Sequence, residues 1–352
     1  MRLLVTGGAG FIGSSFVRMA IARSHRVTVL DLLTYAGNLA NLDSVRESKD
    51  FRFVKGDIGD GELAERLLRE SAFDAVVNFA AESHVDRSIM DASPFVVTNV
   101  RGTQTLLDAV RRSGAAARFL QVSTDEVYGS ADDKKPFTEQ HALKPSSPYA
   151  ASKTSADLFV LAYHHTFKMD ALITRCSNNY GPFQFPEKLI PLFTTNLMEG
   201  KKVPVYGDGM QVRDWIHCDD HSRGVFAALE KGKGGQVYNF GGGNGMANLE
   251  ITQLLLKLTG RGKEFIQYVQ DRPGHDRVYL INHEKATREL GWKPEVSFQD
   301  GLAKTVAWYR DNRAWWEAVK SGEYLSYYEA QYGNKMQNAK SKMQKDGNDT
   351  HA

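Results

Sequence analysis

The feature that most constrains the fold is a glycine-rich turn near the start of the chain, between an apolar strand and an apolar helical segment. Residues 2–6 (RLLVT) predict a buried strand, and residues 7–13 (GGAGFIG) follow it with Gly7, Gly10 and Gly13. Glycines let the backbone turn tightly and approach a pyrophosphate at the positive end of a helix, and the last one permits close packing. The spacing is GxxGxxG rather than GxGxxG, so this motif indicates a dinucleotide site only together with its surroundings.

A second strand, residues 26–30 (RVTVL), supports the dinucleotide interpretation because it ends in Asp31. At this distance from the glycines, a carboxylate holds the ribose hydroxyls of the adenosine. A carboxylate also repels a 2′-phosphate, so the sequence favours NAD over NADP. Taken alone, Asp31 could instead cap a following turn. The glycine turn and the strand together favour the cofactor role.

Apolar strand-like runs alternate with helical segments through the first half of the chain. Further strands are expected at residues 51–54, 75–79, 119–122 and 171–174. Repeated βα units predict an α/β fold, a Rossmann-like doubly wound parallel sheet. Beyond about residue 180, prolines and a glycine triplet at 241–243 change the pattern. We therefore expect a mainly NAD-binding domain over 1–180, a smaller C-terminal substrate-binding lobe over 181–332 with strands returning to the sheet, and a disordered tail over 333–352.

Composition narrows the class of protein. Lys and Arg total 44 against 42 Asp and Glu, which gives a formal charge of +2 and argues against a nucleic-acid surface. Cys176 and Cys218 are too few for a disulfide framework and lack metal-ligand spacing, so no metal is predicted. No secretory signal precedes the first strand, and no apolar run reaches the roughly 18 residues of a membrane span. We expect a cytoplasmic protein with two reduced core thiols and no membrane partner.

Chemistry is indicated where the strand over 119–122 should end, at Thr124, Asp125 and Glu126. Side chains at the carboxyl end of a parallel strand project into the ligand crevice, where adjacent carboxylates can act as acid and base. Tyr149 and Lys153 stand four apart, so on a helix they share a face, and an ammonium there would lower the pKa of the phenol. On an ordinary loop the two carboxylates would be solvated charges. The surrounding motifs favour catalysis.

These motifs together resemble a known family. TGGAGFIG at 6–13, AAESHVDRS at 80–88, STDEVYG at 123–129 and YAASK at 149–153 are similar to extended short-chain dehydrogenase/reductases that act on nucleotide sugars. The resemblance covers residues 1 to about 332. Asp125–Glu126 points to the members that dehydrate the sugar, because relatives that epimerise it usually carry small or hydroxyl residues there. Thr124 stands where the wider superfamily has serine, as is usual in the dehydratases.

The resemblance implies a reaction in three steps on dTDP-glucose, with NAD as cofactor. Tyr149, helped by Thr124 and Lys153, would take the proton of the 4-hydroxyl while hydride leaves carbon 4. Glu126 would then remove the proton of carbon 5 while Asp125 protonates the departing 6-hydroxyl, and the hydride would return to carbon 6.

The resemblance also implies ligand contacts by position. Cofactor-binding residues would be Gly7, Gly10, Phe11, Ile12, Gly13, Asp31, Leu32, Leu33, Thr34, Asp57, Ile58, Ala80, Ala81, Ser83, Thr98, Tyr149, Lys153 and Asn179. Substrate-binding residues would be Ser83, Thr124, Asn178, Glu187, Lys188, Leu189, Pro204, Val205, Tyr206, Arg213, Asn248, Arg272 and His275. The helix expected over 94–110 serves either the core or the subunit contact of a homodimer, which the resemblance favours.

Two other functions remain open. A nucleotide-sugar 4-epimerase or decarboxylase would share Tyr149 and Lys153 but would not need the carboxylate pair. A non-catalytic NAD-binding protein would be expected to have lost part of the catalytic set. Thr124, Asp125, Glu126, Tyr149 and Lys153 are all present, which favours an enzyme of the dehydrating type.

Overall fold

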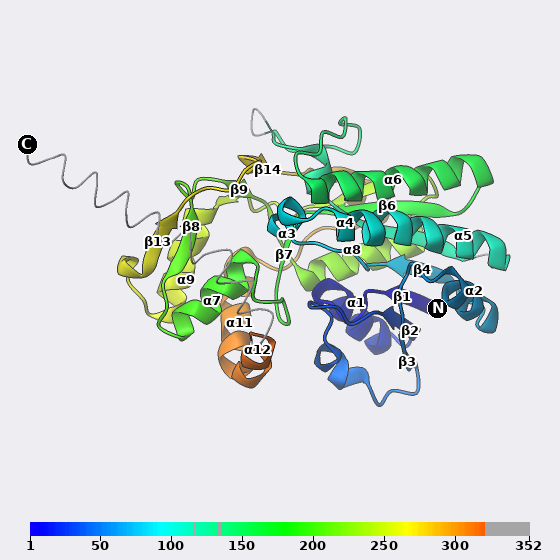
Figure 1. The fold of residues 1–352 in the computed structure, drawn as a ribbon, viewed down its shortest axis with the longest axis horizontal. Coiled ribbons are helices and arrows are strands. Elements are labelled where there is room, and N and C mark those ends of the chain that lie inside the picture. The colour runs from blue at the N-terminus through cyan, green and yellow to red at the C-terminus, as the bar shows by residue number, and fades with distance from the viewer. Residues whose placement is uncertain (116, 132–134, 321–352) are drawn as a thin grey trace, which may run out of the picture.

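The computed structural model describes residues 1–115, 117–131 and 135–320, and it is organised around a seven-stranded sheet (Figure 1). The strand order is β11-β6-β5-β4-β1-β2-β3, and every neighbouring pair is parallel. The strands are β1 (Arg2–Thr6), β2 (Arg26–Asp31), β3 (Phe51–Lys55), β4 (Ala75–Asn78), β5 (Arg118–Thr124), β6 (Ala171–Cys176) and β11 (Val237–Phe240). The predicted doubly wound parallel sheet is confirmed, and the tail over 333–352 lies outside the described residues.

The strand order reverses at the centre of the sheet. From β1 the chain goes outward through β2 and β3, and then returns to the other side of β1 to lay down β4, β5 and β6. In the register, Val5 of β1 lies between Val29 of β2 and Val77 of β4. Ligands of open α/β sheets bind at such a reversal, outside the carboxyl ends of the strands. The site is therefore expected beyond Thr6 and Asn78.

Helices cover both faces of this sheet, as its buried strands require (Figure 1). On one face, α1 (Phe11–Ala22) packs against α8 (Cys218–Lys231), with the rings of Phe16 and Phe226 stacked 4.4 Å apart. On the other face lie α2 (Gly61–Glu70), α5 (Thr103–Ser113) and α6 (Pro148–Phe167). Within the described residues, no helix has the length and apolar character that crossing a bilayer requires.

A smaller lobe, at the left of Figure 1, follows β6 and has a hydrophobic core of its own. Ile190, Trp215, Leu255 and Phe298 are among the buried residues of this core. The helices of this lobe are α7 (Leu189–Met198), α9 (Asn248–Thr259), α11 (Phe298–Asp311) and α12 (Arg313–Val319), with the short helix η4 (Lys263–Phe265). Its short strands are β7 (Asn178–Tyr180), β8 (Val203–Tyr206), β9 (Val212–Arg213), β10 (Trp215–His217), β12 (Met246–Ala247), β13 (Ile266–Val269) and β14 (Val278–Tyr279). The helix α10 (Glu284–Leu290) instead packs against α8 and β11 of the large sheet.

The single helix expected over 94–110 is broken into different helical types. The segment is made of α4 (Ser93–Phe95), a π-helical stretch η2 (Val96–Gly102) and then α5, and the separate helix α3 (Val85–Met90) precedes it. Elsewhere, η1 (Leu39–Val45) and η3 (Asp125–Tyr128) are 3₁₀ turns. The π-helical stretch contains the buried Asn99, whose amide exchanges two hydrogen bonds of 2.9 Å with the backbone of Glu82. This wide turn therefore holds the segment after β4, and such π-helical turns are frequent at functional sites.

Candidate active site

A cavity of about 430 Å³ opens at the reversal of strand order and extends into the smaller lobe. Its walls include every predicted site residue except Leu33, whose side chain packs against the core while its N–H donates to Asp31 Oδ1 over 2.8 Å. Apart from Leu33, the residues that sequence reasoning proposed for the cofactor, the reaction and the nucleotide sugar therefore line one continuous cavity.

The cofactor half of the cavity is shaped around the glycine turn. Gly7 has a φ of +67°, and a Cβ there would lie 2.5 Å from the backbone nitrogen of Ala80, so a side chain is excluded. A Cβ on Gly13 would lie 2.2 Å from the carbonyl oxygen of Gly7. The first turn of α1 carries no acidic residue and begins at Gly10, which provides no side-chain cap. The free backbone N–H groups of this first turn suit a pyrophosphate. This half of the cavity therefore fits a dinucleotide.

Asp31 lies at the end of β2 on the wall of the same half. Its Oδ2 accepts the N–H of Ala9 over 2.9 Å, and its Oδ1 accepts that of Leu33 over 2.8 Å. Burial raises the pKa of Asp31, and these two hydrogen bonds oppose the rise. The carboxylate is thus tied to the glycine turn and keeps lone pairs for ribose hydroxyls.

The carboxylates Asp125 and Glu126 follow directly on β5, in the 3₁₀ turn η3. Thr124 caps this turn, because its hydroxyl accepts the N–H of Glu126 over 3.2 Å and donates to Asp125 Oδ1 at 3.2 Å. Asp125 is 2% exposed. Burial, and after it the neighbouring Glu126 and Asp214, raise its pKa well above the usual range.

Glu126 differs from Asp125 in the charges around it. Burial raises the pKa of Glu126 as well, but Arg272, Lys188 and Arg213 all lower it. Two neighbouring carboxyl groups whose environments push their pKa values apart are suited to opposite roles. Asp125 is the group more readily kept protonated, and Glu126 is the one more readily ionised.

Tyr149 and Lys153 lie in the first turns of α6. The helix begins at Ser147, whose hydroxyl accepts the N–H of Ala150 over 3.1 Å, and Pro148 occupies its first position. Lys153 Nζ donates to the carbonyl of Val122 over 2.8 Å, and burial lowers its pKa. The predicted face on one helix is confirmed.

The predicted lowering of the Tyr149 pKa is wrong for the chain by itself. Burial raises the pKa of Tyr149 well above 10, and the nearby Glu126 carboxylate adds to the rise, whereas a hydrogen bond from Thr124 opposes it. The physical reason is that Tyr149 lies among carboxylates, while the ammonium of Lys153 is bonded to a backbone carbonyl of β5. A further positive charge in the site would favour ionisation of Tyr149.

The half of the cavity in the smaller lobe is lined by basic side chains. Arg213 is 5% exposed, donates to the carbonyls of Val212 and Asp276, and lies 4.2 Å from the ring centre of Tyr279. Lys188 Nζ donates to the carbonyl of Ser83 over 2.8 Å. Forked guanidinium donors suit the oxygens of a diphosphate.

Asp86 is a cavity residue that sequence reasoning did not single out. Its Oδ1 accepts Arg272 Nη1 over 2.9 Å, and its Oδ2 accepts the hydroxyl of Tyr206 over 3.0 Å. Asp86 is 5% exposed, and these contacts join α3 to the smaller lobe. The signal available in the sequence was its place within AAESHVDRS at 80–88, the segment from which Ala80, Ala81 and Ser83 were predicted to line the site.

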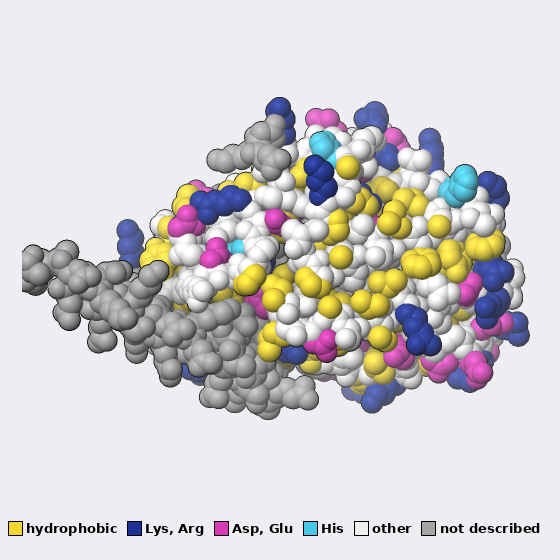
Figure 2. Space-filling view, turned by 45° about the horizontal axis from the view of Figure 1, so that its top comes forward, with side chains coloured by type: hydrophobic (Ala, Val, Ile, Leu, Met, Phe, Trp, Pro, Cys, Tyr) yellow, Lys and Arg dark blue, Asp and Glu magenta, His cyan; other side chains and the backbone are white. Residues whose placement is uncertain are grey.

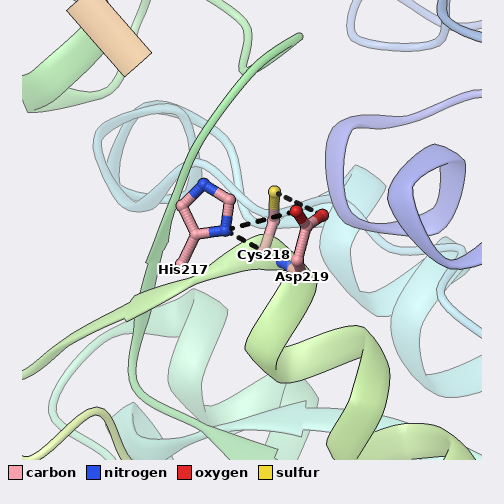
Figure 3. Close-up of side chains that lie close together, drawn as sticks. All are labelled: His217, Cys218 and Asp219. Carbon is pink, nitrogen blue, oxygen red and sulfur yellow. Dashed lines mark hydrogen bonds and ion pairs between the residues drawn. The ribbon is translucent and has the colours of Figure 1, made fainter. Parts of the chain in front are cut away.

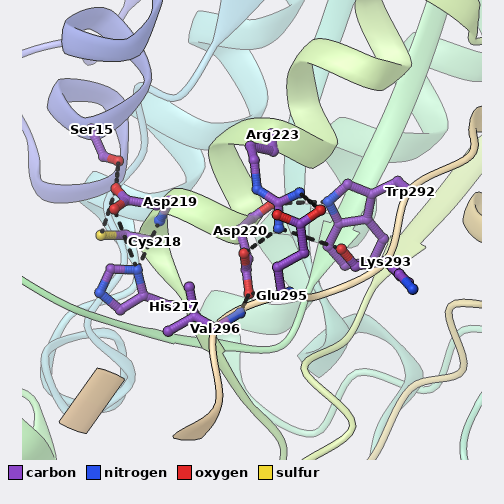
Figure 4. A network of polar contacts seen from close by, with 10 residues as sticks. All are labelled: Ser15, His217, Cys218, Asp219, Asp220, Arg223, Trp292, Lys293, Glu295 and Val296. Atoms are coloured by element: carbon purple, nitrogen blue, oxygen red, sulfur yellow. Dashed lines mark hydrogen bonds and ion pairs between the residues drawn. The ribbon is translucent and has the colours of Figure 1, made fainter. Parts of the chain in front are cut away.

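The side chains of His217, Cys218 and Asp219 offer possible metal-ligand atoms within 4.8 Å of one another (Figure 3). His217 Nδ1 accepts the N–H of Asp219 over 3.3 Å, and Asp219 Oδ1 accepts the hydroxyl of Ser15 over 3.0 Å (Figure 4). Burial raises the pKa of the Cys218 thiol, and the cluster stands at the positive end of α8. Each of these features disfavours a cation.

Comparison with known proteins agrees with this geometry. A family profile described as GDP-mannose 4,6 dehydratase matches residues 4–305. A dTDP-glucose 4,6-dehydratase of an Actinoplanes species is 54% identical over 90% of this chain and 100% of its own length. That of Escherichia coli is 45% identical over 94% of this chain and 99% of its own.

Solved structures give the same picture. The crystal structure of DesIV, a dTDP-glucose 4,6-dehydratase of Streptomyces venezuelae with NAD bound, is 55% identical, has a TM-score of 0.89, and is matched over 91% of this chain and 100% of that one. A UDP-glucose 4-epimerase of Thermotoga maritima is 32% identical with a TM-score of 0.83, over 89% and 100%.

The fold and the site thus define a Rossmann-fold protein of the extended short-chain dehydrogenase/reductase class. Sequence identity of 45–55% over nearly the whole length of both chains also identifies the family within this class. The chain belongs to the dTDP-glucose 4,6-dehydratase family.

Proposed function

We propose that this protein is a hydro-lyase that converts dTDP-glucose into dTDP-4-keto-6-deoxyglucose with NAD as a retained cofactor. The observation that carries the proposal is the carboxyl pair of the buried Asp125 and the partly buried Glu126, which line one cavity with Tyr149. A 4-epimerase shares the fold and the tyrosine, but its chemistry needs no such pair. The names of the relatives at 45–54% identity support the same reaction.

The first step is oxidation at carbon 4 of the glucose. Tyr149 takes the proton of the 4-hydroxyl, and Thr124, whose hydroxyl lowers the pKa of Tyr149, orients the 4-hydroxyl of the sugar. Bound NAD supplies the hydride acceptor, returns the same hydride at the end, and adds the positive ring that lowers the pKa of Tyr149. Lys153, held on the carbonyl of Val122, adds a second positive charge on the same face of α6.

The second step removes water across carbons 5 and 6. The 4-ketone acidifies the hydrogen on carbon 5, which Glu126 removes as the ionised base. Asp125 holds its proton because of burial and the adjacent charge, and it gives that proton to the departing 6-hydroxyl. After hydride returns to carbon 6, Glu126 returns its proton to carbon 5. The site is restored when Tyr149 releases the proton that it took from the 4-hydroxyl and Asp125 takes up a proton in place of the one that left with water.

The nucleoside diphosphate occupies the half of the cavity in the smaller lobe. Arg213, Arg272 and Lys188 contact the diphosphate, and their charges also lower the pKa of Glu126. Substrate binding therefore places the anionic diphosphate against the cations that keep the base ionised. The aromatic ring of Tyr206, held by Asp86, faces the nucleoside.

The protein forms a homodimer through η2 and α6. Val96, Val97 and Leu158 are more than half exposed at 54–55%, and Phe159 is 36% exposed. Figure 2 shows hydrophobic side chains gathered on the face that carries these helices. Apolar side chains grouped in this way favour a subunit contact.

The proposed location is the cytoplasm. Its support is the pair of cysteines, which are both free and buried and so suit a reducing compartment.

Incubation with dTDP-, UDP-, GDP- and ADP-glucose tests the proposed function. We expect dTDP-glucose to give a product lighter by one water and carrying a ketone, with no stoichiometric NADH. Deuterium on carbon 4 should reappear on carbon 6 of the same molecule, and deuterated solvent should label carbon 5. Return of the label to carbon 4 would instead identify an epimerase, and release of NADH a dehydrogenase.

A further inference from the structure

Tyr35 joins the two halves of the cavity although the proposed mechanism does not use it. It lies four positions after Asp31, in the segment between β2 and η1 that borders the cofactor half. Its hydroxyl donates to Glu187 Oε1 over 3.0 Å. Glu187 lies 152 positions away, immediately before Lys188 and α7. A side chain of the cofactor segment thus ends on the segment that faces the nucleotide sugar.

The surroundings hold Tyr35 in this place. The guanidinium of Arg87 lies 3.9 Å from the centre of the Tyr35 ring, and the ring of Phe185 meets it edge-on at 5.4 Å. Arg87 Nε is also 3.5 Å from Glu187 Oε2, and the Glu187 side chain is 2% exposed. Tyr35 and Arg87, which are partly exposed, and the buried Glu187 therefore form a group in which each contacts the other two.

Glu187 passes this constraint to the substrate half. The next residue, Lys188, donates to the carbonyl of Ser83, and Leu189 begins α7. Glu187, Lys188 and Leu189 all line the cavity, and so does Thr34, the neighbour of Tyr35. Displacement of the segment around Tyr35 would therefore displace Glu187, and with it the backbone that carries Lys188 and Leu189.

We infer that Tyr35 is a positioning residue that couples the two ligands of this site, because its hydroxyl ties the cofactor segment to Glu187. The inference rests on the proposed function for the identity of the ligands. NAD that orders the segment around Tyr35 would also order the segment around Glu187, which faces the nucleotide sugar. Binding of the cofactor and binding of the nucleotide should therefore strengthen each other. Such coupling is reciprocal.

The charge state of Glu187 makes the expected coupling depend on pH, which packing alone would not do. Burial raises the pKa of Glu187 to about 7, opposed by Lys188, by Arg87 and by the hydrogen bond from Tyr35, and assisted by Glu82. His84, with Nε2 4.0 Å from Glu187 Oε2, stays neutral because burial lowers its pKa well below the usual range.

Tyr35 itself remains a donor, since burial and Glu187 raise its pKa well above 10. As the pH falls through the pKa of Glu187, Arg87 loses its counter-charge, and coupling should weaken. Removal of the Tyr35 hydroxyl takes away one of the contacts that lower this pKa, so Glu187 should then take up its proton at higher pH.

Exchange of bound NAD for labelled NAD, measured on the purified holoenzyme with and without saturating dTDP, tests the inference. In the unmodified protein at about pH 8, we expect dTDP to slow exchange about tenfold, a typical coupling. In Tyr35→Phe, which keeps the ring over Arg87, we expect dTDP to slow exchange less than about twofold. Tyr268→Phe, which removes a hydroxyl from a residue 41% exposed on β13, is the matched control and should behave like the unmodified protein.

The outcomes separate this inference from the proposed function. Equal slowing in Tyr35→Phe and the unmodified protein, or no slowing in the latter, would overturn the coupling role. An effect of dTDP in the unmodified protein that is as large at about pH 6 as at about pH 8 would overturn the part assigned to Glu187. Calorimetry of dTDP binding is the separate check: absence of binding to the unmodified holoenzyme would overturn the proposed function.

Discussion

Cofactor choice gives the sharpest quantitative test of the site. The change is Asp31→Asn, which keeps an oxygen that can accept the N–H of Ala9 or Leu33 but removes the charge. We expect the unmodified protein to bind NAD far more tightly than NADP, and the variant to lose most of that difference. Asp57→Asn, at an exposed position lining the same half of the cavity, removes a charge nearby and is the matched control.

The size of the effect follows from the position of Asp31 at the end of β2. A carboxylate that can bond the ribose hydroxyls would stand about 4 Å from the charge of a 2′-phosphate, which at an effective dielectric constant of about 20 costs about 4 kcal/mol. That energy corresponds to about a thousandfold in affinity. We expect about a thousandfold preference for NAD in the unmodified protein and in Asp57→Asn, and about tenfold or less in Asp31→Asn.

Competition between NAD and NADP for the site, read by mass spectrometry of the bound cofactor, measures these ratios. Because burial raises the pKa of Asp31, the preference should also decline on acidification at a higher pH than for an exposed aspartate. An Asp31→Asn variant that still preferred NAD a thousandfold would refute the electrostatic argument. A loss of preference in Asp57→Asn would show that the effect is not specific to Asp31.

Three further predictions address the chemistry, the core and the assembly. In a single turnover on dTDP-glucose, Tyr149→Phe should abolish the absorbance of NADH. Glu126→Gln should still form NADH and a 4-keto-glucose species but should slow elimination by about 10²–10⁴-fold. Equal loss of NADH in both variants would show that the roles of the two residues are divided wrongly. Asp157→Ala should lower the free energy of unfolding, measured by urea titration, by about 3–5 kcal/mol. The reason is that the buried Arg175, which lies 2.9 Å from the Asp157 carboxylate, would lose its counter-charge. A loss below about 1 kcal/mol would contradict this prediction. Leu158→Glu should give a monomer by light scattering at concentrations where the unmodified protein is a dimer, and an unchanged mass would exclude this face as the contact.

The sequence was most informative where one local pattern determines both structure and chemistry. The glycine turn and Asp31 each predicted a strand end and a role, and the structure places them together on the cofactor half of the cavity. The face shared by Tyr149 and Lys153 followed from helical spacing alone.

Contacts between distant segments could not be predicted in this way. The bond from Tyr35 to Glu187 and the contacts of Asp86 with Tyr206 and Arg272 join segments 120–186 positions apart, and no local pattern encodes such partners. The raised pKa of Tyr149 was missed for the same reason, because it depends on burial and on Glu126 rather than on the neighbour four residues along the helix.

The course of the chain through the sheet limits how this protein can be divided. The edge strand β11 and the covering helix α8 belong to the sheet but come from sequence beyond the first segment of the smaller lobe. A fragment ending near residue 180 would uncover the edge of β6 and remove Phe226 from its stack on Phe16. A chimaera that takes the smaller lobe from a relative would therefore need several junctions, on both sides of α8 and β11. Such an exchange of specificity is more readily made by changing individual residues of the cavity than by recombining whole segments.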